Sequence, residues 1–224
     1  GEGNFCIFAR MHQSILILDF GSQYTQLIAR RVRELNVYCE IHPYNYSDKA
    51  MANMPGLKGI ILSGSPASVR DAGAPMPDLS GIRKKYPVLG ICYGAQLMAH
   101  QNGGEVMPSK IREYGRAEIN VSNGSCELLK DFRSGSQVWM SHAETNASVN
   151  DTIEVVAATA DVKEGAYRIR GENTYGIQFH PEVTHTSEGK QLLKNFVMGI
   201  CGCAGDWTPE SFVEETINGL KKKI

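Results

Sequence analysis

Short apolar runs alternate with segments of helical periodicity along the first half of the chain. Residues 15–18 read Ile-Leu-Ile-Leu, and 23–35 place apolar side chains at helical spacing opposite a polar face. Further apolar runs occur at 59–62 and 88–91, and the second leads into a helical segment over 93–101. Continuous apolar runs are typical of strands buried on both faces. The pattern therefore predicts an α/β fold, a doubly wound and mostly parallel sheet with helices on both faces.

The period changes after about residue 105, where strand-like runs are joined by turns instead of helices. These runs are expected at 117–121, 137–140, 153–158, 166–169 and 175–179. Helical spacing returns around 192–200 and again over 209–220. We therefore expect the second half to add an antiparallel β extension to the same sheet.

The length and charge of the chain limit its organisation and its partners. Its 224 residues fit one large domain with at most a small appendage. Lys and Arg number 23 against 24 Asp and Glu, so no broad positive field attracts nucleic acid or an anionic membrane. No apolar run approaches the roughly 18 residues of a membrane-spanning helix. We expect a folded, soluble domain without nucleic-acid or membrane partners.

The six cysteines are scattered along the chain, which favours a reducing, cytoplasmic setting over a disulfide framework. Cys201 and Cys203 form the one close pair, and a C-x-C without a second pair nearby is a poor zinc site, so no metal is expected. Residues 1–10 are interpreted as a cloning-derived segment before a native start at Met11. The main domain is expected over 11–207, followed by a helix or linker over 208–224.

The pentapeptide Gly90-Ile91-Cys92-Tyr93-Gly94 lies where a predicted strand meets the following helix. A G-x-nucleophile-x-G sequence at such a junction is the pattern of a nucleophile elbow, in which the nucleophile occupies a strained turn. The glycines let neighbouring backbone approach, and the N-terminus of the helix favours a thiolate. Cys92 is therefore the candidate nucleophile, and a buried structural cysteine is the alternative.

Two histidines could act as the base for Cys92, because each follows a predicted strand. His180 lies in Gln-Phe-His-Pro-Glu, where Glu182 could orient the imidazole and stabilise its charged form. His142 lies in Met-Ser-His-Ala-Glu. The pattern favours His180 and leaves His142 as the competing base.

Two widely separated motifs resemble those of the class I, triad-type glutamine amidotransferases. They are Gly-Ile-Cys-Tyr-Gly-Ala-Gln at 90–96 and Gln-Phe-His-Pro-Glu-Val at 178–183. The segments at 19–31, 138–142 and 180–186 narrow the resemblance to the amidotransferase domains of the GMP synthetase family. The similarity extends from about Ser14 to Trp207. It implies a flavodoxin-like amidotransferase fold.

The resemblance also implies a reaction and a set of site residues. L-glutamine would be hydrolysed to glutamate and ammonia through a thioester on Cys92, with His180 as acid and base and Glu182 as its orienting carboxylate. The oxyanion hole would use the backbone N–H of Tyr93 and one from the loop at 63–66, where Ser-Gly-Ser-Pro replaces the commoner Ser-Gly-Gly-Pro. This second donor is assigned to Ser65, with Gly64 as the alternative. The implied substrate-binding residues are Gln96 and the backbone of Ser141, His142 and Ala143.

In the GMP synthetase family the ammonia passes to an ATP pyrophosphatase domain or subunit that aminates XMP to GMP. The phosphate loop of that part, Ser-Gly-Gly-Val-Asp-Ser, does not occur in this sequence. We therefore expect an excised domain or a small subunit, and the ending in a helix and a Lys run favours excision. No cofactor is expected for this domain, because ATP and Mg²⁺ would belong to the synthetase part. Thr184, His185 and Thr186 are the candidate docking surface.

Two other interpretations fit parts of the sequence. A Cys-dependent hydrolase or peptidase of the same fold would keep the elbow but not the segments at 19–31 and 183–186. A non-catalytic regulatory module on this fold would be indicated by loss of Cys92 or His180, and both are present. The sequence therefore favours the amidotransferase.

Overall fold

The computed structural model describes residues 12–148, 150–211, 213 and 217, and only the backbone at 109–114 and 142–148. Within these residues nine strands form one sheet in the order β2-β1-β3-β4-β9-β8-β7-β5-β6. The segment expected to be cloning-derived lies outside the described residues, as does most of 208–224. The strands are β1 (Ser14–Asp19), β2 (Tyr38–Pro43), β3 (Leu57–Leu62), β4 (Val88–Ile91), β5 (Glu105–Val121), β6 (Ser136–Ser148), β7 (Ile153–Ala158), β8 (Ala166–Ile169) and β9 (Thr174–Ile177).

The strands β2, β1, β3, β4 and β9 are parallel neighbours. Their order is that of a flavodoxin-like sheet, with β9 in the place of the fifth strand. The carboxyl ends of parallel strands meet at one edge of a sheet, so the loops that follow β1, β3, β4 and β9 are brought together. This arrangement confirms the α/β fold class expected from the sequence.

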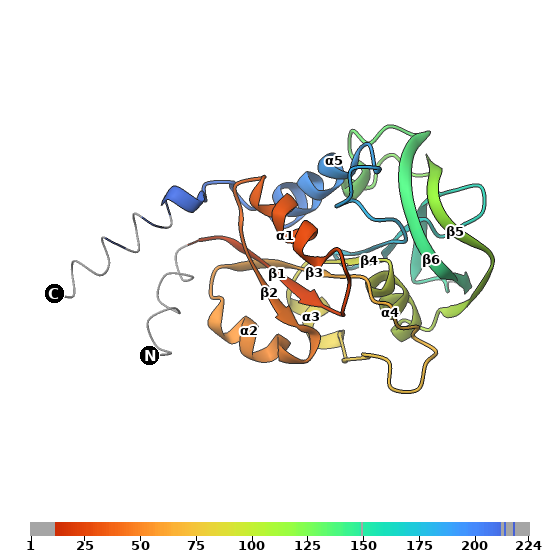
Figure 1. Ribbon diagram of the computed structural model, residues 1–224, viewed down its shortest axis with the longest axis horizontal. Helices are drawn as coiled ribbons and strands as arrows, with labels where there is room; N and C mark the ends of the chain where they lie inside the picture. The colour runs from red at the N-terminus through yellow and green to blue at the C-terminus, as the bar shows by residue number, and fades with distance from the viewer. Residues whose placement is uncertain (1–11, 149, 212, 214–216, 218–224) are drawn as a thin grey trace.

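The strands β8, β7, β5 and β6 continue the sheet with antiparallel pairing. Here β5 and β6 are much longer than the runs expected at 117–121 and 137–140. Figure 1 shows them as a long, curved hairpin at the end of the sheet opposite β2. The expected runs cover parts of this hairpin with buried side chains, such as Ile119, Val138 and Met140, but not the buried Val106 near the start of β5.

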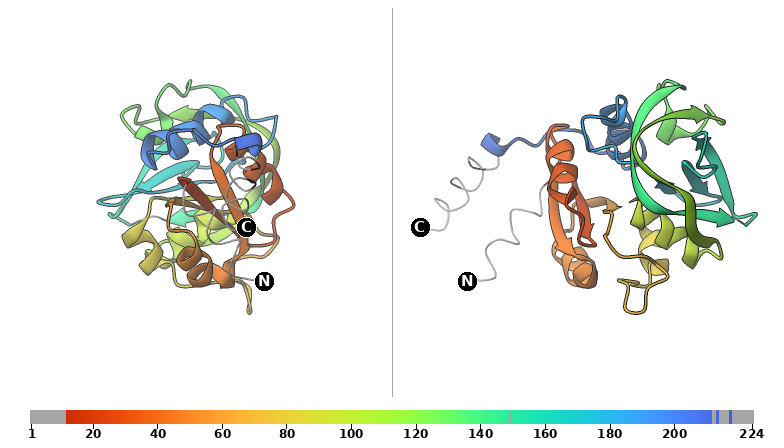
Figure 2. Two further views of the ribbon diagram at one scale, coloured as in Figure 1. Left: turned by 90° about the vertical axis from the view of Figure 1, so that its left-hand side faces the viewer. Right: turned by 45° about the vertical axis from the view of Figure 1, so that its right-hand side comes forward.

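Helices cover both faces of the parallel strands (Figures 1 and 2). Alternate residues of β1 enter two apolar clusters, with Ile15 and Ile17 on one face and Leu16 and Leu18 on the other. The first face is covered by α1 (Thr25–Arg33), α5 (Gly189–Lys194) and the π-helical segment η4 (Asn195–Ile200), the second by α2 (Ser47–Asn53), α3 (Ser80–Lys85) and α4 (Tyr93–Gln101). The double burial explains the continuous apolar runs.

One helix leaves no clear signal in the sequence. Only Ile82 of α3 is buried, and the helix ends in Arg83, Lys84 and Lys85, so its apolar periodicity is too short to register. In the part of the chain that the structure describes, no helix combines the length and apolar character needed to cross a membrane.

Candidate active site

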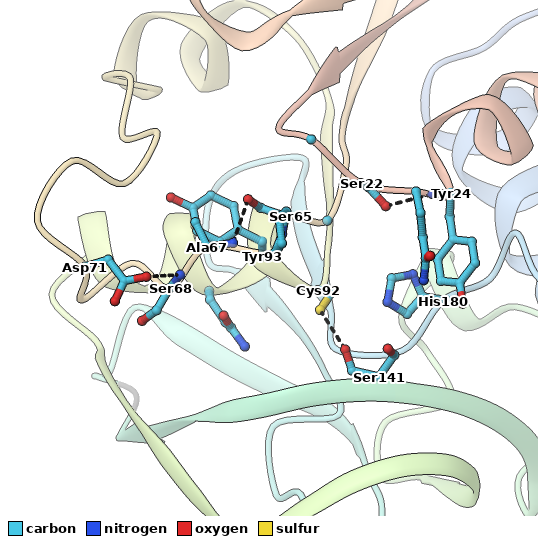
Figure 3. A pocket seen from close by; sticks show the side chains of 15 residues that line it. Ser22, Tyr24, Ser65, Ala67, Ser68, Asp71, Cys92, Tyr93, Ser141 and His180 are labelled. Carbon is cyan, nitrogen blue, oxygen red and sulfur yellow. Dashed lines mark hydrogen bonds between the residues drawn. The ribbon is translucent and has the colours of Figure 1, made fainter.

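Loops from four parallel strands enclose a cavity of about 550 Å³ at the carboxyl edge of the sheet (Figure 3). Strand order reverses between β1 and β3, and such switch points are where open α/β sheets bind ligands. The loops after β1, β3, β4 and β9 all contribute. The lining residues are Gly21, Ser22, Gln23, Tyr24, Gly64, Ser65, Pro66, Ala67, Ser68, Asp71, Cys92, Tyr93, Gln96, Ser141 and His180.

Cys92 occupies the strained turn between β4 and α4. Its φ of 52° and ψ of −105° are sparsely populated for a residue with a side chain. A Cβ on Gly94 would lie 2.6 Å from the Cβ of Leu62, and one on Gly90 would lie 2.6 Å from the backbone carbon of Gly94. Both positions therefore require glycine for close backbone approach, as the nucleophile elbow predicted.

His180 and Glu182 form a buried pair beside the thiol. The imidazole Nδ1 lies 2.7 Å from Oε1 of Glu182, and the two side chains are 4% and 0% exposed. Burial lowers the pKa of His180, but the Glu182 charge and the nearby Cys92 thiol outweigh it and raise the pKa to about 10. The pair therefore favours a protonated imidazole in the cavity that Cys92 also lines.

The backbone of His180 is attached to the free edge of β6. Its N–H donates to the carbonyl of Trp139 at 3.0 Å, and its carbonyl accepts the hydroxyl of Thr186 at 2.6 Å. The Thr186 oxygen in turn accepts the N–H of Trp139 at 3.0 Å. Thr186 is thus buried and bound to the loop of His180, so its expected place on a docking surface is wrong. Thr184 and His185 are exposed.

Two backbone regions face the sulfur at the proposed oxyanion hole. Tyr93 is the first residue of α4, so its N–H has no acceptor within the helix. A Cβ on Gly64 would lie 3.7 Å from the Cβ of Cys92 and 3.4 Å from Cε1 of His180, so the Gly64 backbone is close to both. Ser65 also lines the cavity, and its hydroxyl accepts the N–H of Ala67 at 3.1 Å.

The side chain of Tyr93 is used for packing, away from the thiol. Its hydroxyl donates to the carbonyl of Pro75 at 2.9 Å, and its ring lies 5.6 Å from that of Phe20. Burial, with Tyr44 and Asp71 nearby, raises the pKa of Tyr93 to about 12. Only the backbone of Tyr93 is therefore available to a reacting group.

Gln96 lines the cavity and also contacts Gln178, a residue that the sequence analysis did not assign to the site. The Gln96 amide donates to Oε1 of Gln178 at 3.2 Å, and the Gln178 amide donates to Sγ of Cys92 at 3.6 Å. The thiol also approaches the carbonyl of Ser141, at 3.9 Å. In the sequence Gln178 is a polar residue within the run expected at 175–179 and within the His180 motif, and the structure places it directly after β9.

Tyr24 was also missed, although it lies in the segment at 19–31. Its ring meets the His180 ring edge-on, with the centroids 5.2 Å apart. His142 and Ala143 lie in β6, where the backbone of His142 is paired with Glu113. Their side chains are outside the described part of the structure. His180 is therefore the histidine that the described residues bring to Cys92.

A family model for class-I glutamine amidotransferases matches residues 16–200. The chain belongs to this family. A putative GMP synthase subunit protein from Thermoplasma acidophilum has the same amidotransferase fold, with a TM-score of 0.74, 30% identity, and coverage of 85% of this chain and 94% of that one. A glutamine amidotransferase from Thermotoga maritima shares the fold at 17% identity, with a TM-score of 0.69 and coverage of 85% and 98%.

Two bacterial proteins named GMP synthase [glutamine-hydrolyzing] are similar to this amidotransferase. The one from Cytophaga hutchinsonii is 60% identical and the one from Christiangramia forsetii is 54% identical, each over 214 residues. Each match covers 96% of the chain but only 42% of the relative. The amidotransferase thus spans less than half the length of these relatives.

Proposed function

We propose that this chain hydrolyses L-glutamine to glutamate and ammonia as the ammonia-producing part of a GMP synthase. The observation that carries the proposal is Cys92, held on a strained turn in a cavity that His180 also lines, with His180 paired to the buried Glu182. The names of the relatives support the same assignment.

In the proposed first step the Cys92 thiolate attacks the carboxamide carbon of glutamine. The carbonyl oxygen becomes an oxyanion facing the N–H of Tyr93 and a second N–H from the loop at 63–66. Given the position of its backbone, Gly64 is as well placed as Ser65 to provide that second donor. The His180 imidazolium gives its proton to the departing nitrogen, so ammonia leaves and a thioester remains.

In the second step a water molecule attacks the thioester while His180 accepts its proton. The carbon–sulfur bond then breaks, glutamate leaves, and the proton is held again between Cys92 and His180. Glu182 keeps the imidazole in position through its 2.7 Å contact with Nδ1, which leaves Nε2 for proton transfer. No cofactor takes part in either step.

The α-amino and carboxylate groups of glutamine would bind beside the nucleophile. The carbonyl of Ser141 lines the cavity within 3.9 Å of the sulfur and suits an ammonium group. We assign the backbone of His142 and Ala143, next along β6, to the rest of this subsite, and Gln96 to the side chain of the substrate.

The ammonia acceptor would lie in a part of the enzyme that this chain does not cover. The match to 42% of the relatives' length leaves room for an ATP-dependent synthetase that converts XMP to GMP. The residues at 208–224 would lead toward it. The five described cysteines are unpaired and buried, which fits the cytoplasm.

The proposal is tested by measuring ammonia release from glutamine with the wild type and with Cys92→Ala. We expect Cys92→Ala to abolish release while retaining the fold, His180→Ala to be nearly as damaging, and Glu182→Ala to leave more activity. A glutamine-mimicking electrophile should label Cys92, and Cys126→Ala, a change at a buried thiol elsewhere, should not alter labelling. Labelling at another cysteine, with Cys92 untouched, would contradict the assignment.

A second experiment tests the partner. The isolated chain should release ammonia slowly and should not aminate XMP. Adding the remaining part of the enzyme with ATP and XMP should raise glutamine turnover, because catalytic geometry often tightens only in the assembled complex. Full activity of the isolated chain, unaffected by the loaded partner, would refute this coupling.

A further inference from the structure

The sulfur of Cys92 accepts a hydrogen bond from the side chain of Gln178. Gln178 follows β9, is 1% exposed, and directs its amide nitrogen to Sγ at 3.6 Å. It does not line the cavity, so this contact reaches the nucleophile from the protein side. A buried amide pointed at a nucleophile can stabilise negative charge there without occupying the space that the substrate needs.

The Gln178 amide is hydrogen-bonded to the side chain of Gln96. An amide group can be reversed to present either its oxygen or its nitrogen to a neighbour. Here Oε1 of Gln178 accepts a hydrogen bond from Nε2 of Gln96 at 3.2 Å, and Gln96 is 4% exposed. In this arrangement Gln178 presents its nitrogen, the donor end, to Cys92.

A backbone acceptor near the sulfur has the opposite effect. The carbonyl of Ser141 lies 3.9 Å from Sγ, where it can accept the S–H of the thiol but repels a thiolate. The thiol is thus placed between a group that favours its protonated form and one that favours its ionised form. Without Gln178, the Ser141 carbonyl and His180 would remain to influence whether the Cys92 thiol is protonated or ionised.

We propose that Gln178, oriented by Gln96, is a further catalytic residue that stabilises the Cys92 thiolate and aims it into the cavity. The inference deepens the proposed function, because it rests on Cys92 being the nucleophile. It also makes Gln96 a positioning residue that acts on the sulfur through Gln178.

Other ionisable groups around the sulfur stay unchanged when Gln178 is replaced. The one closest to it is His180, whose raised pKa keeps a positive charge near the sulfur. The remaining described groups come from the loop after β1, the loop after β3, the start of α4 and the segment after β9. They are Tyr24, Asp71, Tyr93 and Glu182.

The test is the pH dependence of Cys92 alkylation by iodoacetamide, followed by peptide mapping so that other cysteines do not contribute. Gln178→Met keeps the volume but loses the donor. We expect the pH of half-maximal alkylation to rise by about one unit, because a hydrogen bond to a charged group is lost, and the rate below that pH to fall about tenfold. Gln96→Met, which lets the Gln178 amide turn, should give a smaller rise.

Gln137→Met is the matched control. The Gln137 side chain donates to the carbonyl of His185 at 2.7 Å, so it also supports the loop after His180 but does not touch the sulfur. We expect its alkylation profile to match that of the wild type. An unchanged profile for Gln178→Met, or an equal rise for Gln137→Met, would overturn the inference. If Gln178→Met does not fold, an unchanged profile for Gln96→Met overturns it instead.

A kinetic measurement separates this inference from the proposed function. With glutamine as substrate, Gln178→Met should lower kcat about tenfold at neutral pH and leave KM within about twofold, because Gln178 touches the sulfur and not the cavity. Alkylation does not require glutamine. A wild type that shows the expected profile but releases no ammonia contradicts the proposed function alone. A wild type that releases ammonia while Gln178→Met keeps its profile contradicts this inference alone.

Discussion

Thr186→Val is the substitution whose effect the structure defines most closely. The hydroxyl of Thr186 donates to the carbonyl of His180 at 2.6 Å and accepts the N–H of Trp139 at 3.0 Å. Valine has nearly the same shape but can do neither, so one buried and one partly buried backbone group lose a partner. Each group left unpaired costs about 1–3 kcal/mol, and we expect the free energy of unfolding to fall by about 3 kcal/mol.

Urea unfolding measures this loss. For an m-value of about 3 kcal/mol/M, the midpoint should fall by about 1 M with an unchanged slope. Thr186→Ser keeps the hydroxyl and should recover most of the stability. Thr184→Val makes the same change at an exposed position of the same loop and should alter the free energy by less than about 0.5 kcal/mol.

The activity of Thr186→Val provides a second test of the same reasoning. Because the hydroxyl fixes the backbone of His180, its loss should lower kcat for glutamine hydrolysis about tenfold under conditions where the variant is folded. Thr186→Ser should restore kcat. A midpoint for Thr186→Val equal to that of Thr184→Val would refute the claim that this hydroxyl holds β6 and the His180 loop together.

Two further predictions concern the charged pair and the elbow. The pKa of His180 is raised to about 10, so its imidazolium stabilises the fold fully below about pH 6.5 and less as pH rises toward 10. The urea midpoint of the wild type should therefore fall between about pH 6.5 and about pH 10. The midpoint of Glu182→Gln should change less over the same range. A Cβ on Gly94 would lie 2.6 Å from Leu62, so Gly94→Ala should lower Tm by several degrees, whereas Gly81→Ala, on an open helical surface, should leave it unchanged or raise it.

The local parts of the site could be predicted from the sequence because their geometry depends on neighbouring residues. The elbow needs small residues two positions either side of Cys92, and the structure places Gly90 and Gly94 against backbone there. Glu182 lies two residues after His180, which is close enough for the 2.7 Å pair that forms. In both cases the spacing in the sequence already fixes most of the distance in space.

The fold class could also be predicted, because burial on both faces of a parallel strand leaves a continuous apolar run. The ends of the antiparallel hairpin could not be predicted from the sequence. The strands β5 and β6 extend to Glu105 and Ser148, beyond the apolar part of either strand, and they are held there by pairing with each other. Such pairing depends on the partner strand and leaves little periodicity in either sequence.

The contacts that tune the nucleophile were decided by the tertiary structure alone. Gln178 and Cys92 are 86 positions apart, and Thr186 and Trp139 are 47 apart, so no local spacing predicts that either pair meets. By itself, the sequence predicted the layered fold, the strained turn at Cys92 and the His180–Glu182 pair, because burial and short spacing leave a pattern along the chain. The packing of β9 against β4, and of the His180 loop against β6, decided which polar groups reach the sulfur and hold its base, because hydrogen bonds between distant segments require the folded sheet.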